Sequence, residues 1–305
     1  MSATLQTAGA LRGSLGTELL ERSSAVERVG RLRFVRWLAS GGMGEIYLGY
    51  DETLGRDVAI KTLSKISRLD PEQRRHLHRE ARMLARAQHP GICQLHDLIS
   101  AEEGDYLVME YLPGHTLAAQ PPSPTSAVEI VRSVAMILAD LHGASIVHRD
   151  IKPDNIMVTS YERVKLLDLG IAGFIGHFRD VAGTTAYMSP EQAVGFPLAP
   201  AMDIYALGAV LFEFSTGQRI NAFANVTAIR RSRRQIPESL DPDLRALLAR
   251  MLDLDPAKRP SALEVVSALD AILDTKTQRS RRRGFAFWAA TACGFAGAMA
   301  LGSLI

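Results

Sequence analysis

Hydrophobic and polar residues alternate over the first third of the chain, and the hydrophobic spacing then becomes helical. Strand-like segments lie at 32–38, 45–50, 57–62, 93–99 and 105–111, separated by glycine-rich or polar turns. Between the third and fourth of these segments, residues 71–88 are rich in Arg, Glu, Leu and Ala and predict a helix. The first third therefore predicts a five-stranded sheet accompanied by one helix.

After Gly114 the pattern predicts helices. Ser126 and Glu129 have the spacing of a capping box, and apolar residues follow at helical intervals at Ile130, Val134, Ile137, Leu138 and Leu141. Residues 203–216 are mostly apolar, as expected of a helix buried inside a large unit. Ser261 and Glu264 form a second capping box before a last helix, which we expect to end at Asp274. Residues 120–125 are rich in Pro, Ser and Thr and predict a loop.

The two ends of the chain differ from this pattern. Residues 1–30 are small or polar with weak periodicity and predict a mobile leader. Residues 284–305 carry no charge, and as a helix they would span about 33 Å, enough to cross a bilayer. Residues 275–283 form a basic linker whose four arginines favour the cytoplasmic side. We expect a C-terminal transmembrane anchor in the inner membrane, with the rest cytoplasmic; a buried C-terminal helix is the alternative.

Composition narrows the function classes. The chain has 305 residues, 47% of them hydrophobic and 22% charged, which is enough for a sizeable core. The net charge of +2 gives no argument for a nucleic-acid partner. The two cysteines, Cys93 and Cys293, are far apart, so we expect a reducing compartment and no disulfide framework.

One motif indicates specific chemistry. Residues 148–155 read His-Arg-Asp-Ile-Lys-Pro-Asp-Asn, and Asp168-Leu169-Gly170 follows further along the chain. Phosphoryl transfer needs a carboxylate that orients the attacking hydroxyl and oxygen ligands that hold magnesium. Asp150 would supply the carboxylate, and Asn155 and Asp168 would supply the ligands. With these motifs in this order, the chain resembles the eukaryotic-type (Hanks-type) protein kinases, in particular their bacterial serine/threonine branch.

The resemblance covers residues 31–273 and implies an α+β, bilobal kinase fold. The small β-rich lobe would comprise residues 31–112, and the larger helical lobe residues 113–274. It also implies a serine/threonine protein kinase that transfers the γ-phosphate of ATP to protein hydroxyls, with Mg²⁺, or Mn²⁺ in its place. Two rival interpretations are a pseudokinase scaffold at the membrane and a kinase of small molecules such as aminoglycosides.

In the small lobe, the resemblance assigns a nucleotide-covering hairpin and a catalytic lysine. Leu38, Gly41, Gly42, Gly44 and Ile46 belong to that hairpin, in which Ala39 replaces the first glycine of the family pattern. Lys61 would contact the α- and β-phosphates and pair with Glu80, because a lysine on an apolar strand is costly without a partner. The alternative is a lysine at a strand edge with its ammonium in water.

The resemblance also implies an adenine pocket. Met109 would be the gatekeeper, and the backbone of Glu110 and Leu112 would hydrogen-bond the base. Ile46, Ala59 and Met157 would clamp the ring. Taken singly, each of these apolar residues is more often a core residue than a cofactor contact.

In the large lobe, Asp150 would accept the proton of the substrate hydroxyl, and Lys152 would steady the γ-phosphoryl group by its charge. Lys152 together with Gly183-Thr184 indicates serine or threonine substrates. The resemblance further implies two structural roles: Glu191 pairs with Arg259, and Asp203 anchors the catalytic loop through backbone hydrogen bonds.

The activation segment departs from the family pattern, since no Ser, Thr or Tyr lies between Asp168 and Gly183. Asp180 stands where many relatives are phosphorylated. Our hypothesis is that Asp180 offers Arg149 a permanent negative charge; a solvated loop aspartate is the alternative. Thr184 and Thr185 are candidate autophosphorylation sites.

Two further surface features have open interpretations. Arg230-Arg231 and Arg233-Arg234 would recruit acidic substrates or anionic lipid, or would simply be a solvated face. In the tail, small residues recur every fourth position at Ala290, Gly294, Ala298 and Gly302, which favours a homodimer; the abundance of small residues explains the spacing nearly as well.

Overall fold

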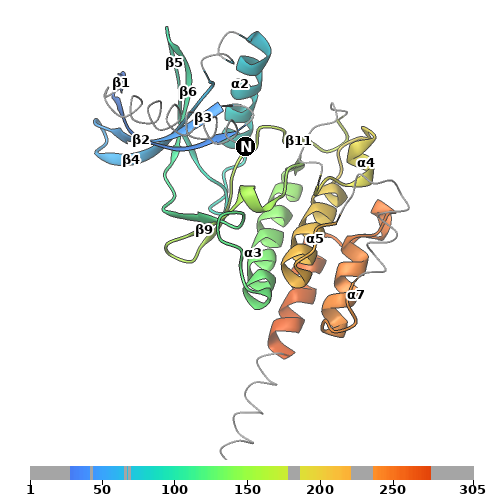
Figure 1. The fold of residues 1–305 in the computed structure, drawn as a ribbon. Coiled ribbons are helices and arrows are strands. Elements are labelled where there is room, and N and C mark those ends of the chain that lie inside the picture. The colour runs from blue at the N-terminus through green and yellow to red at the C-terminus, as the bar shows by residue number, and fades with distance from the viewer. Residues whose placement is uncertain are drawn as a thin grey trace, which may run out of the picture. The chain divides into compact units, whose positions relative to one another are not determined.

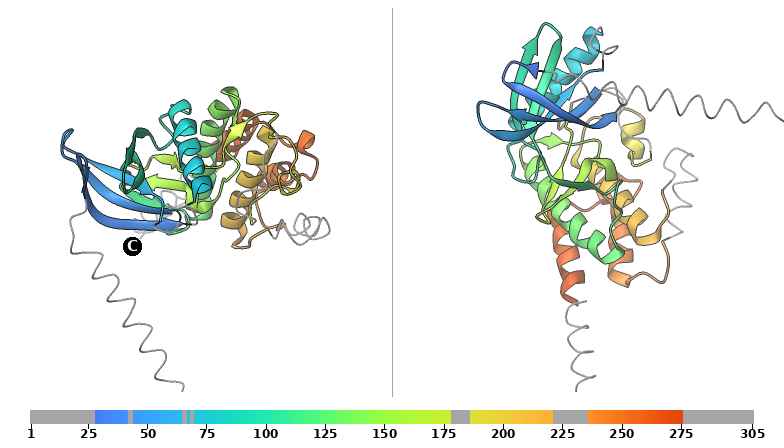
Figure 2. Two further views of the ribbon diagram at one scale, coloured as in Figure 1. Left: turned by 90° about the horizontal axis from the view of Figure 1, so that it is seen from above. Right: turned by 60° about the vertical axis from the view of Figure 1, so that its left-hand side comes forward.

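The computed structural model describes residues 28–41, 44–64, 67, 70–177, 186–220 and 236–275. The chain divides into two compact units, Met1–Pro113 and Gly114–Ile305. Figure 1 labels their helices and strands, and Figure 2 gives two further views.

The first unit is built on a six-stranded antiparallel sheet. Its strands are β1 (Arg28–Val29), β2 (Leu32–Gly41), β3 (Gly44–Asp51), β4 (Arg56–Thr62), β5 (Leu95–Ala101) and β6 (Gly104–Glu110), in the order β1-β2-β3-β4-β6-β5. The sheet curls strongly (Figure 2). Helix α2 (Pro71–Arg86) packs against β5 and β6 (Figure 1).

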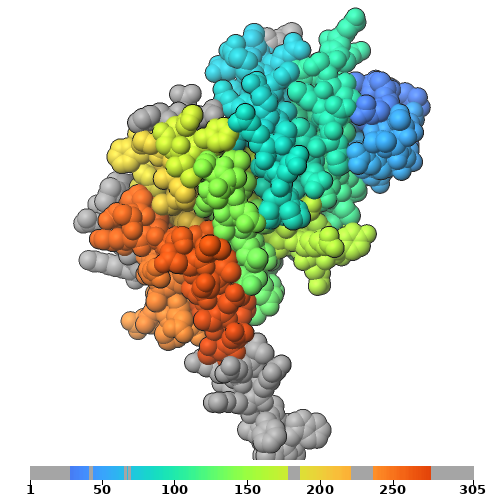
Figure 3. Space-filling view, turned by 180° about the vertical axis from the view of Figure 1, so that it is seen from behind, coloured from blue at the N-terminus to red at the C-terminus, as the bar shows by residue number. Residues whose placement is uncertain are grey.

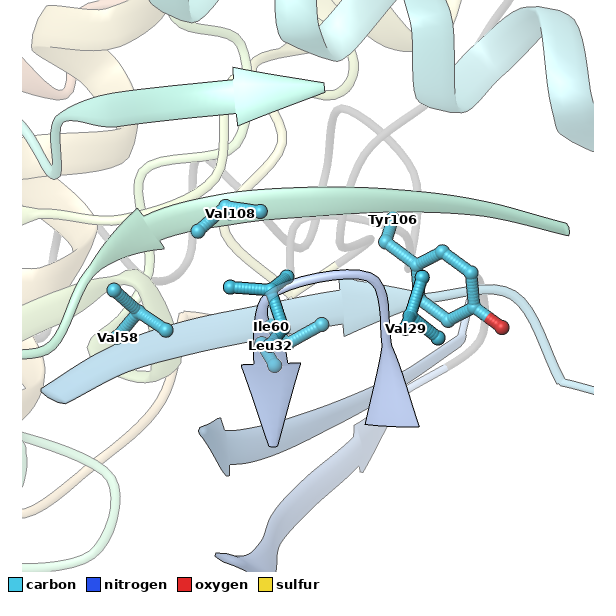
Figure 4. Close-up of a cluster of buried hydrophobic side chains, with 6 residues drawn as sticks. All are labelled: Val29, Leu32, Val58, Ile60, Tyr106 and Val108. Carbon is cyan, nitrogen blue, oxygen red and sulfur yellow. The ribbon is translucent and has the colours of Figure 1, made fainter. Parts of the chain in front are cut away.

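The curled sheet encloses a hydrophobic cluster of Val29, Leu32, Val58, Ile60, Tyr106 and Val108 (Figure 4). Side chains of a strand point alternately to its two faces. On β4, Val58 and Ile60 therefore enter this cluster, while Ala59 and Lys61 face the opposite side. All four are buried, so the strand is apolar on both faces and presents a lysine on one of them.

Two predictions for this unit are wrong. The sheet has six strands instead of five, because Arg28 and Val29 form β1 and pair with Arg33 and Leu32. The predicted mobile leader therefore does not extend through residue 30: Gly30, with φ 57°, belongs to the turn between β1 and β2. The leader prediction missed this strand because a two-residue strand is too short to show alternation.

The second unit is mainly helical. Its helices are α3 (Pro124–Gly143), α4 (Pro190–Ala193), α5 (Pro200–Thr216), α7 (Pro242–Met251) and residues 262–275, with short 3₁₀ turns η2 (Pro153–Asn155) and η3 (Pro256–Lys258). Helix α5 packs against both α3 and α7 (Figure 1) and is buried without interruption from Met202 to Phe212. This confirms the predicted buried helix, which begins three residues earlier than expected.

Two small antiparallel sheets complete the second unit. One has the order β10-β9-β7, with β7 (Gly114–Thr116), β9 (Ile156–Thr159) and β10 (Val164–Leu166). The other pairs β11 (Gly173–Phe174) with β8 (Ile146–Val147). The segment that joins β8 to β9 carries the His-Arg-Asp motif, so these short strands fix both of its ends.

The two predicted capping boxes have different outcomes. At the last helix the prediction is confirmed, since Ser261 Oγ accepts the Glu264 N–H at 3.3 Å and Glu264 accepts the Ser261 N–H at 2.7 Å. At α3 it is wrong. The cap is Ser123, whose Oγ accepts the Ser126 N–H at 3.2 Å, and the helix begins at Pro124. Proline with its preset φ favours the first helical position, which moves the start into the predicted loop.

Within the described residues, no helix is long and apolar enough to cross a membrane. The predicted anchor, residues 284–305, lies outside them, as do the basic cluster 279–283 and residues 1–27.

Candidate active site

The hairpin between β2 and β3 carries the predicted nucleotide-covering residues of the first unit. Leu38 lies on β2, and Gly41 pairs with Gly44 across the hairpin, while Gly42 lies outside the described residues. A Cβ atom on Gly44 would lie 2.2 Å from the carbonyl oxygen of Thr62 on β4. Packing of the sheet therefore requires glycine at this position, independently of any ligand.

Ala39 stands where the family pattern has its first glycine. It pairs with Ile46 across the hairpin, next to a register shift at Trp37. Among described non-glycine residues the positive φ angles are at Ser145, Arg149, Glu162 and Asp168, and Ala39 is not one of them. The backbone at Ala39 therefore accepts a Cβ atom without strain.

Lys61 and Glu80 form a buried ion pair. The Lys61 Nζ atom lies 2.6 Å and 2.7 Å from the two carboxylate oxygens of Glu80. The side chains are only 8% and 3% exposed. The alternative of a strand-edge lysine with its ammonium in water is therefore wrong.

Helix α2 supplies the glutamate of this pair because its sequence buries one face. Asp70 caps the helix by accepting the Glu72 N–H at 2.8 Å, and Pro71 occupies the first turn. Glu80 is carried inward on the same face as the buried apolar residues of the helix, which are Leu77, Ala81, Met83 and Leu84.

The predicted gatekeeper and one predicted ring contact are neighbours in the sheet. Met109 on β6 pairs with Ala59 on β4, and both are buried. Ile46 lies on β3, directly opposite Lys61. Met157, the third predicted ring contact after Ala59 and Ile46, lies on β9 in the second unit.

Glu110, a predicted backbone contact of adenine, already uses its backbone N–H in a hydrogen bond within the protein. This N–H donates to the Gln94 carbonyl at 2.8 Å, while the Glu110 carbonyl accepts a weak hydrogen bond from the Cys93 thiol at 3.6 Å. Any backbone contribution of Glu110 to adenine recognition must therefore use the carbonyl oxygen, which can accept from an amino group. Leu112 follows two residues later and is half-buried.

Asp150, Lys152 and Asn155 converge in the second unit. The Lys152 Nζ atom donates to Asp150 Oδ2 at 2.7 Å, and the Asn155 Nδ2 atom donates to the same oxygen at 2.9 Å. Asn155 Nδ2 also donates to the Asp150 carbonyl at 2.9 Å. This network fixes the orientation of the Asp150 carboxylate and directs the Asn155 Oδ1 oxygen away from it.

Asp203 of α5 fixes the start of the loop that carries Asp150. Its carboxylate accepts the backbone N–H groups of His148 and Arg149 at 2.9 and 2.8 Å, and the Nε2 atom of His142 lies at 2.9 Å. Complete burial would raise the pKa of Asp203, but hydrogen bonding and the charge of His142 outweigh it and lower the pKa below its ordinary value. The predicted backbone anchor is confirmed.

Arg149 has a left-handed backbone, with φ 72°, which is uncommon for a residue with a side chain. The contacts of this residue include the Asp203 bond to its N–H, a bond from Gln192 Nε2 to its carbonyl at 2.9 Å, and a bond from its guanidinium to the Ile171 carbonyl at 2.9 Å. The surrounding structure thus fixes the conformation that turns the chain into Asp150.

Asp168 lies beside the catalytic loop. The Leu167 N–H donates to the Asn155 carbonyl at 2.9 Å, which ties the Asp168 segment to η2. Asp168 itself has φ 56°, and its Oδ1 atom accepts the Gly170 N–H at 2.7 Å. Leu169, where the family pattern has phenylalanine, is completely buried. The two predicted metal ligands are therefore held next to each other by one backbone hydrogen bond.

The predicted structural pair of Glu191 and Arg259 is confirmed. Two guanidinium nitrogens of Arg259 lie 2.5 and 2.9 Å from the Glu191 carboxylate oxygens, and both side chains are buried. Ser189 caps α4 and so orients Glu191 toward this partner. The pair is bidentate, the strongest geometry for an arginine and a carboxylate.

Several predicted residues lie outside the described residues. They are Gly42, Asp180, Gly183, Thr184, Thr185, Arg230, Arg231, Arg233, Arg234 and the small residues of the tail.

The profile of the protein kinase domain matches residues 32–269, which is most of the chain. The chain belongs to the protein kinase family. Within this family, the chain is similar to curated bacterial serine/threonine-protein kinases.

Three of these relatives show the extent of the similarity. Serine/threonine-protein kinase PknA of Mycobacterium tuberculosis is 36% identical over 250 residues, covering 76% of this chain and 58% of PknA. PrkC of Bacillus subtilis is 40% identical over 199 residues, covering 62% of this chain and 31% of PrkC. PknB of Mycobacterium leprae is 39% identical over 196 residues, covering 59% and 32%. The matches thus span a little over half of PknA and about a third of the other two.

The second unit of this kinase has oxygen donors that suit a divalent cation. Mg²⁺ prefers one or two carboxylate or amide oxygens from the protein and takes further ligands from phosphates and water. Asp168 offers a carboxylate, and Asn155 offers Oδ1, because its Nδ2 atom donates to Asp150. The residues present therefore fit the metal that the family uses.

Sequence reasoning missed several positioning contacts. His142, Gln192 and Ile171 were given no role. Their contacts with Asp203 and Arg149 join residues more than twenty positions apart. The signal available for such a contact is a polar residue among apolar ones, such as His142 at the end of α3.

Proposed function

We propose that this kinase uses ATP and Mg²⁺ to phosphorylate serine and threonine residues of proteins, with Asp150 as the catalytic base. The observation that carries the proposal is the convergence of Lys152 and Asn155 on one oxygen of Asp150, at 2.7 and 2.9 Å. We assign the other oxygen, Oδ1, to the substrate hydroxyl. Asp150 takes up the hydroxyl proton while the hydroxyl oxygen of the substrate bonds to the γ-phosphorus and ADP leaves.

Lys152 has a second task in this scheme. Its ammonium is fixed beside Asp150, within reach of a phosphoryl group that is in line with the hydroxyl. Negative charge shifts during transfer, and a positive charge fixed in advance stabilises it without reorganisation. Bound Mg²⁺ would add neutralising charge at the β- and γ-phosphates, with Asn155 and Asp168 as its protein ligands.

The residues of the first unit would bind the rest of the nucleotide. Lys61, held by Glu80, would contact the α- and β-phosphates, and Gly41, Gly42 and Gly44 would cover them. The Glu110 carbonyl would accept from the adenine amino group, and the Leu112 N–H would donate to the ring. We propose that both units act on this one nucleotide, with Leu38, Ile46, Ala59, Met109 and Met157 around the base.

An acceptor panel tests this function. The 305-residue chain is incubated with γ-labelled ATP, Mg²⁺ and either casein or an aminoglycoside, and the label is traced by phosphoamino-acid analysis. We expect label on serine and threonine of the protein acceptor, and none with Asp150→Asn. Label on the aminoglycoside alone would indicate a small-molecule kinase. Nucleotide binding without transfer to any acceptor would indicate a pseudokinase.

We also propose that residues 284–305 anchor the kinase in the inner membrane with the catalytic units in the cytoplasm. The support is the uncharged run of residues and the preceding arginines at 279 and 281–283. The test is alkaline extraction of membranes that contain the 305-residue chain or a chain ending at residue 278. We expect the first to stay in the pellet and the second to be released. Extraction of both chains would contradict the membrane anchor. Cross-linking in the same membranes tests whether the tail forms a dimer.

A further proposal concerns activation. No hydroxyl residue lies between Asp168 and Gly183, so a phosphate cannot be placed there. We propose that Asp180 supplies a constant negative charge for Arg149. Asp180→Ala should then lower activity, while Asp180→Glu should retain most of it. Full activity of the alanine variant would exclude this role.

A further inference from the structure

A buried carboxylate beside α2 has no part in the phosphoryl-transfer scheme. Asp105 is the second residue of β6, and its side chain is completely buried. It accepts two hydrogen bonds from the Arg74 guanidinium, at 2.5 and 3.0 Å, and the His78 Nε2 atom lies at 2.6 Å. The Arg74 hydrogen bond above all, with further ones from Ser100 and His78, holds the pKa of Asp105 far below its ordinary value, despite burial. Asp105 is therefore an anion that holds two side chains of one helix.

Asp105 is also tied to the strand that carries the catalytic lysine. The Thr62 hydroxyl donates to the Asp105 carbonyl at 3.2 Å, and Thr62 directly follows Lys61 on β4. In the sheet, Thr62 pairs with Tyr106 and Lys61 pairs with Leu107. The Asp105 carboxylate and the Lys61 ammonium therefore belong to neighbouring strands, β6 and β4, that are hydrogen-bonded to each other.

In addition to its buried apolar face, helix α2 is tied to the sheet by polar contacts at two places along its length. One is the Lys61–Glu80 ion pair, and the other is the set of hydrogen bonds between Asp105 and the side chains of Arg74 and His78. Glu80 lies six positions after Arg74, which is about 9 Å along a helix axis. A helix held at two points cannot slide or rotate without breaking one of them. Figures 1 and 3 show α2 beside the β5–β6 hairpin, in cyan and teal.

We infer that Asp105 is a positioning residue for phosphoryl transfer. By holding Arg74 and His78, it fixes α2 where Glu80 reaches both hydrogen-bonding positions on the Lys61 ammonium. The inference rests on the proposed role of the Lys61–Glu80 pair. Without the second attachment, α2 has freedom to move outward, and Lys61 loses the partner that holds it in place.

The matched control lies on the same helix. Arg75 is the next residue after Arg74, is exposed, and makes no ion pair or side-chain hydrogen bond among the described residues. Arg74→Ala and Arg75→Ala change the helix propensity and the net charge equally. They differ only in whether Asp105 loses a partner. Arg74→Lys keeps the charge but loses the two-pronged geometry, so it should restore part of any loss.

The experiment measures kcat and ATP KM of the 305-residue chain at a temperature where circular dichroism shows each variant folded. A displacement of about 1 Å at a catalytic group can cost up to about a hundredfold in rate, and we expect Arg74→Ala to lower kcat by roughly tenfold. Asp105→Asn should do the same, and Arg75→Ala should match the unmodified chain. Asp150→Asn in the same assay tests the transfer function separately. If this variant still transfers phosphate, the result counts against Asp150 as the base and not against the positioning role of Asp105.

A double-mutant cycle separates positioning from general stability. Arg74→Ala is combined with Glu80→Gln, and both transfer rate and Mg·ATP affinity are measured. If Asp105 acts through Glu80, Arg74→Ala should have little further effect once Glu80 is changed. Equal effects of Arg74→Ala in both backgrounds would overturn the inference, as would equal activities of the Arg74→Ala and Arg75→Ala variants.

Discussion

The two units of this kinase hold their charged site residues in different ways. In the first unit, Lys61 and Glu80 are 19 positions apart, and their pair is almost completely buried. In the second unit, Asp150 is held by Lys152 and Asn155, which lie two and five positions away, and the Lys152–Asp150 pair is more exposed. One pair depends on a helix packed against a sheet, and the other depends on a short loop.

This difference predicts where each region is vulnerable. The loop around Asp150 takes its geometry from backbone conformation, through the left-handed Arg149 and the bonds to Asp203. The Lys61–Glu80 pair takes its geometry from the position of α2, which a movement of the whole helix would change. Activity should therefore be controlled through the first unit, while the chemistry itself should fail most completely with changes in the second.

The largest expected effect is at Asp150. Replacing it by asparagine removes the base, which contributes about 10² to 10⁴ in rate in other enzymes, so kcat should fall by at least about a hundredfold. Asp154→Asn is the matched control, since Asp154 is an exposed carboxylate in the same loop, and it should retain most activity. Comparable losses in both variants would mean that the loop requires negative charge and not a base at Asp150.

The next effect concerns stability in the first unit. Lys61→Met leaves Glu80 buried without its ammonium, and breaking a buried pair costs about 3 to 5 kcal/mol. The free energy of unfolding should fall by that order in urea denaturation. Adding Glu80→Leu should recover much of the stability while transfer activity stays absent. If the double variant is less stable than the single one, the pair is not the source of the loss.

A pH dependence of stability is expected from Asp203 in the second unit. Asp203 has its folded-state pKa below the ordinary 3.8, so between these two values the unfolded chain binds more protons. Its contribution to stability is therefore present above about pH 4 and is lost as the pH falls further. Asp203→Asn should be less stable at neutral pH and should show a shallower loss below pH 4. Asp274→Asn, a change at an exposed residue, should keep the wild-type slope.

The smallest effect tests the corrected cap of α3. Ser123→Ala should cost about 1 kcal/mol of unfolding free energy, the usual value of an N-cap. Ser126→Ala should cost less, because Ser126 lies inside the helix and its N–H still has an acceptor. The reverse order would support the capping box that the sequence predicted.

The sequence was most informative where the chemistry is local. Asp150, Lys152 and Asn155 lie within six residues, and one short motif was enough to single out all three, although their mutual hydrogen bonds were not predicted. The Glu191–Arg259 pair spans 68 positions and was found only through the family resemblance. The contacts of Asp105 and His142 were not predicted, because no short pattern records which polar residue a helix will meet. Strand β1 and the cap at Ser123 were missed for a related reason, since two residues or one Ser-Pro step give too little periodic signal.

We propose that one nucleotide engages residues of both units. Calorimetric titration of the 305-residue chain with Mg·ATP tests it directly, using Lys61→Met from the first unit and Asp168→Asn from the second. We predict one ATP per chain and a loss of affinity of at least about tenfold, or about 1.4 kcal/mol, in each variant. Two binding sites per chain, or an affinity unchanged by either substitution, would contradict the account.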